Sequence, residues 1–75
     1  MDEEQRQEQA ELIARMFALL TAKLEDGAGT ASDAQARDLA PEQVRDAANR
    51  LIELGQEIAT IAEAIAGLNS ARHPG

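Results

Sequence analysis

Residues 41–68 read PEQVRDAANRLIELGQEIATIAEAIAGL. Apolar residues recur in this segment at two positions of a seven-residue repeat, three residues apart. The first position is filled by Val44, Leu51, Ile58 and Ile65, and the second by Ala47, Leu54, Ile61 and Leu68. Such an a/d heptad pattern is typical of a helix that buries one seam against another helix. We therefore expect a long helix over residues 41–68 that packs on other helices.

The two ends of this expected helix carry start and stop signals. Pro41 suits the first helical position, because the N–H that proline lacks would have no intrahelical partner there. Ala40 is a poor N-cap, so we expect no side chain to cap this end. Gly67 and Asn69 favour termination near residue 68. We expect the tail, residues 71–75, to be disordered.

An earlier helix is expected over residues 3–26. Asp2 can cap it, with Gln5 three residues later as in a capping box. Residues 2–9 contain no large apolar side chain, so residues 1–9 are expected to be a frayed or disordered end. Further along, the apolar side chains spread over roughly 160° of the helix surface, which is wider than one neighbouring helix covers. They are Leu12, Ile13, Met16, Phe17, Leu19, Leu20 and Leu24.

The segment between the two helices, residues 27–40, is expected to be the connecting loop. Gly27 can end the first helix in a left-handed cap. Ser32, with Gln35 three residues on, offers a second capping box, so a short helical turn over residues 33–38 is an alternative to an extended loop. The acidic residues near this loop do not have the spacing of a calcium-binding loop.

Two long helices joined by one connection predict an all-α antiparallel helical hairpin. A hairpin has no interior, and both expected apolar stripes are wide, so we expect two copies to form a four-helix bundle. Alternatives are a bundle completed by another helical protein and a three-helix monomer formed by the segment around Leu39. The expected interface residues are Leu12, Ile13, Met16, Phe17, Leu20, Leu24, Val44, Leu51, Leu54, Ile58, Ile61, Ile65 and Leu68.

Composition supports association as the source of stability. The chain has 75 residues, no cysteine and a single histidine, His73. Small domains usually need a disulfide, a metal or a partner chain to be stable. Without cysteines, and with one histidine close to the end, we expect no metal site and no cofactor. Association with another chain remains.

The net charge of −7 restricts the classes of partner. Nucleic acids and anionic membranes are bound mainly through Lys and Arg, so we expect neither as a partner. No apolar run approaches the ~20 residues of a membrane span, and no signal peptide pattern opens the chain. We therefore expect a cytoplasmic protein.

No set of residues in the sequence indicates catalysis. There is no Cys or Tyr, and the only serines are Ser32 and Ser70, in the expected loop and tail. We expect a non-enzymatic interaction module, a homodimerising or docking bundle that joins polypeptides. The alternative is a small acidic regulator, of the antitoxin, anti-sigma or chaperone type, that sequesters a basic partner. A complex held by charge weakens as salt rises, whereas aliphatic packing does not.

Overall fold

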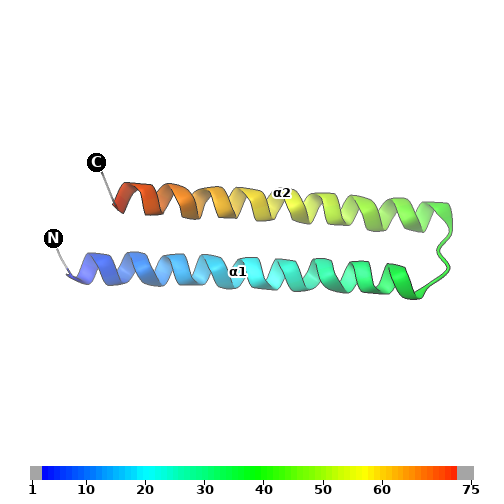
Figure 1. The fold of residues 1–75 in the computed structure, drawn as a ribbon, viewed down its shortest axis with the longest axis horizontal. Helices are drawn as coiled ribbons and strands as arrows, with labels where there is room; N and C mark the ends of the chain where they lie inside the picture. The colour runs from blue at the N-terminus through cyan, green and yellow to red at the C-terminus, as the bar shows by residue number, and fades with distance from the viewer. Residues whose placement is uncertain (1–2, 73–75) are drawn as a thin grey trace.

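A computed structural model describes residues 3–72 of the chain. Within this range the chain forms two helices, α1 (Glu3–Ala36) and α2 (Pro41–Arg72), and no strand. Figure 1 shows the two helices antiparallel and side by side, joined by a short linker at one end. The prediction of an all-α antiparallel hairpin is confirmed.

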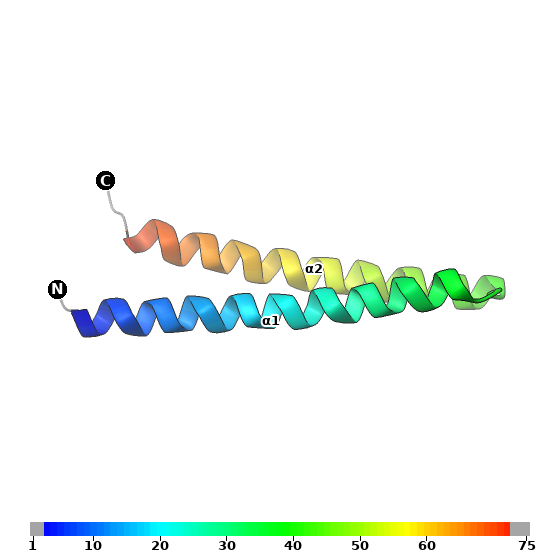
Figure 2. The same ribbon diagram turned by 60° about the horizontal axis from the view of Figure 1, so that its bottom comes forward.

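The hairpin is long and thin. Its principal extents are 57 × 19 × 12 Å and its Cα radius of gyration is 17.2 Å. A compact domain of this length would have a radius of gyration of about 11 Å. In Figure 2 the ribbons overlap near the linker and separate toward the other end, so the helices cross at a shallow angle. The molecule is one layer of two helices, and nothing within residues 3–72 covers either broad side of that layer.

Helix α1 is longer than the sequence predicted, and the expected loop over residues 27–40 is wrong. The helix continues through Gly27 to Ala36. A Cβ placed on Gly27 would lie 3.6 Å from side-chain atoms of both Leu51 and Leu54. Gly27 therefore faces α2, and packing along this part of α1 outweighs the weak helix propensity of glycine.

The capping signals inside the expected loop do not act as caps. Ser32 lies within α1, so the second capping box is wrong. The alternative of a separate helical turn over residues 33–38 is also wrong, because residues 33–36 form the last turn of α1. Residues 37–40 alone connect the helices, which leaves no third helix around Leu39.

Helix α1 begins at Glu3, as predicted, whereas α2 extends further than expected. Residues 3–9 are helical, so of the two alternatives for this stretch, a helical extension or a disordered start, the structure has the helical one. Helix α2 continues past Gly67 and Asn69 to Arg72. The Gln9 side-chain amide donates a 3.2 Å hydrogen bond to the Leu68 carbonyl and links the two ends. The predicted Asp2 cap and residues 73–75 lie outside the described residues.

The start of α2 has a side-chain cap that the sequence analysis missed. The Ala40 N–H donates a 2.9 Å hydrogen bond to Oε1 of Gln43. The Val44 N–H donates a 3.0 Å bond to the Ala40 carbonyl. Gln43 is the third residue of α2, counting Pro41 as the first. In a capping box the side chain at this position accepts a hydrogen bond from the backbone N–H of the N-cap residue, which is the bond seen here. Ala40 itself contributes no side chain to it.

A single seam of side chains lies between the helices. Only Leu20, Leu54 and Ile65 fall below a tenth exposed among the described residues, at 9%, 2% and 8%. On α2, buried and half-buried residues follow the heptad pattern from Ala47 to Leu68. On α1, they recur at alternating intervals of four and three residues. The α1 set is Gln9, Ile13, Met16, Leu20, Lys23, Gly27, Thr30 and Ala34, and Ala31 is half-buried beside it.

Candidate protein-interaction surface

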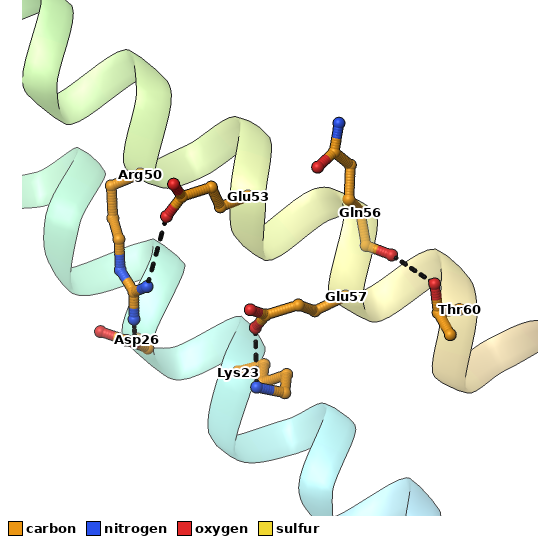
Figure 3. Close-up of polar contacts among 7 residues, drawn as sticks. All are labelled: Lys23, Asp26, Arg50, Glu53, Gln56, Glu57 and Thr60. Carbon is orange, nitrogen blue, oxygen red and sulfur yellow. Dashed lines mark hydrogen bonds and ion pairs between the residues drawn. The ribbon is translucent and has the colours of Figure 1, made fainter.

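The two broad sides of the hairpin differ in chemistry. One side, here called the charged face, carries Lys23, Asp26, Arg50, Glu53 and Glu57 (Figure 3). These side chains come from both helices, so the pairs among them bridge the seam on this side. The arrangement joins α1 to α2 and leaves the opposite side without equivalent contacts in the described residues.

Two interhelical ion pairs form the centre of the charged face. The Lys23 amine lies 2.8 Å from Oε1 of Glu57. The Arg50 guanidinium pairs with Asp26 of α1, and its other terminal nitrogen lies 3.9 Å from Glu53 of α2. All five side chains are partly exposed to solvent, so each pair adds little to stability. Their value is geometric, because they select one register and one rotation of α2 against α1.

The ion pair with Lys23 changes the pKa of the Glu57 carboxylate. Its pKa is lowered from the ordinary value of 4.5, first by the hydrogen bond from Lys23 and then by the charge of the same ammonium. Arg50 lowers this pKa further, and Asp26 acts against it. Because the pKa falls on folding, Glu57 favours the hairpin when it is ionised.

The opposite side, here called the apolar face, is made of four rows of residues. In α1 one row runs from Ala10 to Ala31 and the other from Ala14 to Gln35, and in α2 the rows run from Arg45 to Ala66 and from Ala48 to Asn69, all with a spacing of seven residues. Residues seven apart lie on the same side of a helix in a coiled-coil pair. These rows contain no Asp or Glu, and Arg45 is their one charged residue.

Large side chains on the apolar face are open to solvent in the single hairpin. Phe17 is 53% exposed, and Leu24 and Ile52 are each 57% exposed. Phe17 lines a shallow apolar depression with Ala62 and Ala66 of α2, which places the α1 and α2 rows on the same broad side. An exposed apolar set of this kind, free of carboxylates in a chain of net charge −7, is typical of an interaction surface.

The expected interface residues divide into two groups in the structure. Eight are buried or half-buried along the seam within the hairpin: Ile13, Met16, Leu20, Leu54, Ile58, Ile61, Ile65 and Leu68. The other five are exposed: Leu12, Phe17, Leu24, Val44 and Leu51. The first group holds the hairpin together. In the second group Leu51 also borders the seam, where it faces Gly27, and the other four leave a large part of their side chains open to solvent.

Several contributors were missed by the sequence-based interface. Leu19 and Ile52 are 47% and 57% exposed and belong with the available apolar residues. Lys23 occupies a seam position although it is charged, because its amine reaches Glu57 at the edge of the seam. Arg50 pairs with Asp26 of α1 and with Glu53 of its own helix. The interhelical pairs follow from the heptad positions of α1, which the sequence did not assign because the predicted helix ended at residue 26.

The chemistry available to this surface is packing and charge pairing. Among residues 3–72, no group of three His, Cys, Asp or Glu side chains is placed to hold a metal ion. Neither α1 nor α2 contains a segment with the length and apolarity needed to cross a bilayer. No protein-family model matches the chain, and neither a curated protein nor a solved structure matches it significantly.

Proposed function

We propose that this chain is a non-catalytic interaction module, a helical hairpin that associates with a second copy to form a four-helix bundle. The observation that carries the proposal is the apolar face, where Phe17, Leu24 and Ile52 each leave more than half of their surface exposed. A second layer of helices on this face would bury these side chains. Two layers around one core is the usual architecture of a stable helical domain.

The exposed area supports association. The hairpin exposes 5676 Å². A folded monomer of its 8.0 kDa mass would expose about 4,450 Å². The surplus of about 1,200 Å² exceeds the roughly 800 Å² that each partner buries in a standard protein interface. The hairpin therefore exposes enough surplus surface to supply one side of a standard interface.

The small core points in the same direction. Three residues of the described chain are buried, and they lie in one line between the helices. Helices in proteins gain most of their stability from packing an apolar face against other parts of the structure. A hairpin that packs along a single line is marginal, and a second hairpin would supply the missing packing without a disulfide or a metal.

Light scattering coupled to gel filtration tests the proposal. We expect a mass of about 16 kDa, twice the 8.0 kDa of one chain. A cooperatively unfolding 8.0 kDa monomer at every concentration would contradict self-association. A weakly helical monomer that gains helix when another helical protein is added would instead indicate a docking module that waits for a different partner.

An acidic regulator that sequesters a basic partner is the second candidate, and it rests on the net charge of −7. On the charged face, Asp26 and Glu57 are already paired with Arg50 and Lys23 within the hairpin. A basic partner would have to compete with these cations or use carboxylates elsewhere. Binding of such a partner would weaken steeply as salt is added.

A further inference from the structure

We infer that two copies meet through their apolar faces with both linkers at the same end of the bundle, so that α1 of each copy lies on α2 of the other. The inference rests on the proposed self-association and names its surface and geometry. Two independent observations carry it. One is the distribution of charge over the two broad sides, and the other is the distribution of large and small residues over the apolar face.

Charge selects both the face and the occupant. Each copy carries a net charge of −7, so two copies repel each other wherever carboxylates meet. The apolar face has no Asp or Glu in its four rows between residues 10 and 69, so contact there keeps the carboxylates of both copies apart. The charged face would bring Glu53 and Glu57 of both copies together. Glu3, one heptad before Ala10, stands at the outer end of this face, so between residues 10 and 69 a basic partner would find no carboxylate there to recognise, whereas a second copy would need none.

Large and small residues on the apolar face are complementary between the two helices. Two large side chains, Phe17 and Leu24, lie on α1, one heptad apart. The α2 rows beside them hold Gly55, Ala59 and Ala62. A Cβ on Gly55 would meet no atom within 4 Å, so the surface there is open. On the apolar face of one copy, the large side chains of α1 therefore project outward, and the small residues of α2 leave room for side chains of a partner.

The same relationship is reversed near the linker. Here the large residue is Ile52, on α2. Gly27 lies against Leu51 and Leu54, which places Ile52 level with Ala28 and midway between Leu24 and Ala31 of α1. These two alanines belong to the α1 rows of the apolar face. Phe17, Leu24 and Ile52 thus each lie beside an alanine or a glycine of the other helix.

This pattern decides between the two symmetric ways of stacking the hairpins. A two-fold axis parallel to the helices places α1 over α2 of the partner at the same level and keeps both linkers at one end. Phe17 and Leu24 then pack over Gly55, Ala59 and Ala62 of the partner, and each large side chain fits between small residues of the facing helix, as in knobs-into-holes packing. An axis perpendicular to the helices places α1 over α1, where the large side chains oppose each other and the small residues of α2 leave a void.

Spin-label distances test the geometry directly. The chain has no cysteine, so Asp38→Cys, in the exposed linker, provides one labelling position per copy. If both linkers lie at the same end, the distance between the two spin labels should be short, because it is set by the roughly 10 Å spacing of packed helices and the length of the label side chains. A distance comparable with the 57 Å length of the hairpin would overturn the inference.

A matched pair of glycine variants tests the face. Gly55 lies on the apolar face and Gly67 on the opposite side of α2, and a Cβ on either meets nothing within 4 Å. Neither change should harm the hairpin, so helix content by circular dichroism should be preserved. We expect Gly55→Gln to weaken the dimer by about tenfold or more, because overpacking of a fitted surface is unfavourable, and Gly67→Gln to have no such effect.

The outcomes separate this inference from the proposed function. A chain that stays monomeric in light scattering contradicts the proposed self-association and the inference with it. A dimer with a long label distance, or one weakened by Gly67→Gln and not by Gly55→Gln, leaves self-association intact and overturns the inference alone. A dimer with a short label distance that is sensitive only at Gly55 supports both.

Discussion

The Lys23 amine donates a 2.8 Å hydrogen bond to Oε1 of Glu57 and so joins a seam position of α1 to the charged face of α2. A lysine in a helix seam would normally disfavour packing, because its charge must stay hydrated or paired. Here the aliphatic stem covers the seam and the amine reaches the edge. The pair lies on one broad side only, and it therefore distinguishes the charged face from the apolar face.

The Lys23–Glu57 pair predicts a specific pH dependence. Because folding lowers the pKa of Glu57 below 4.5, its contribution to stability is complete above about pH 4.5 and is lost as the pH falls through the lowered pKa. Glu57→Gln removes this contribution. We expect the variant to melt at a lower temperature than the natural chain at pH 7, and the difference to shrink under acidic conditions. Thermal unfolding followed by circular dichroism at several pH values measures it.

The control for this prediction is Glu63→Gln on the outer side of α2. Glu63 takes part in none of the described ion pairs, which involve residues 11, 15, 23, 26, 50, 53 and 57. Its replacement removes the same charge without removing an interhelical partner. A stability difference for Glu57→Gln that stays constant from neutral to acidic pH would contradict the pairing, whatever its size.

Gly27 provides a prediction about helix packing. Its position is helical, and an added Cβ would make ordinary contacts at 3.6 Å with Leu51 and Leu54. Gly27→Ala should therefore stabilise the hairpin by about 1 kcal/mol, because alanine has the higher helix propensity and its methyl group fits. For a domain of this size, the expected rise in Tm is about 4–8 °C.

Gly29→Ala separates propensity from packing. Gly29 is also inside α1, but a Cβ there meets nothing within 4 Å. This variant should gain from helix propensity alone, so its rise in Tm should not exceed that of Gly27→Ala. A loss of stability for Gly27→Ala with a gain for Gly29→Ala would mean that the helices lie closer together than the structure shows.

The heptad pattern of α2 could be read from the sequence because its seam positions are filled by aliphatic residues without interruption from Leu51 to Leu68. The seam of α1 could not, because Lys23, Gly27 and Thr30 occupy it in the second half of the helix. Local rules interpreted Gly27 as a helix end. Gly27 stays helical because it packs against α2, and the helix propensity of the local sequence gives no information about that contact.

The sequence showed that the apolar stripe of α1 is wide, but it did not show which residues of the stripe face α2 and which lie on each broad side. Its roughly 160° arc combines three sets of positions, because a heptad seam is flanked on both sides. Ile13 and Leu20 face α2, Phe17 and Leu24 lie on the apolar face, and Leu19 lies on the other side. Assigning residues to sides required the position of α2, which the Asp26–Arg50 and Lys23–Glu57 pairs define.

A charge placed in the seam should unfold the hairpin. Ile58 is half-buried between the helices, and Ile58→Asp would leave a carboxylate there without a partner. The cost of several kcal/mol is a large part of the about 4–11 kcal/mol expected for the stability of a domain of this length. We expect loss of helix by circular dichroism. Asn49→Asp, on the exposed outer side of α2, adds the same charge and should preserve helix content.

Salt dependence distinguishes the two candidate functions. A dimer held through the apolar face buries no ion pair in its interface, and each copy carries a net charge of −7. Added salt screens the repulsion between copies, so self-association should be unchanged or stronger between about 0.05 M and 0.5 M salt. Sedimentation equilibrium at several salt concentrations measures this directly.

The opposite result would favour the acidic regulator. A complex formed by attraction between the carboxylates of this chain and a basic partner loses affinity as salt rises, because screening removes the force that forms it. If the self-association of the pure chain weakened markedly with salt, ion pairs between copies would have to hold the dimer. The charged face, with Arg50 and Lys23 among its carboxylates, would then be the interface, since the four rows of the apolar face contain no acidic group to pair.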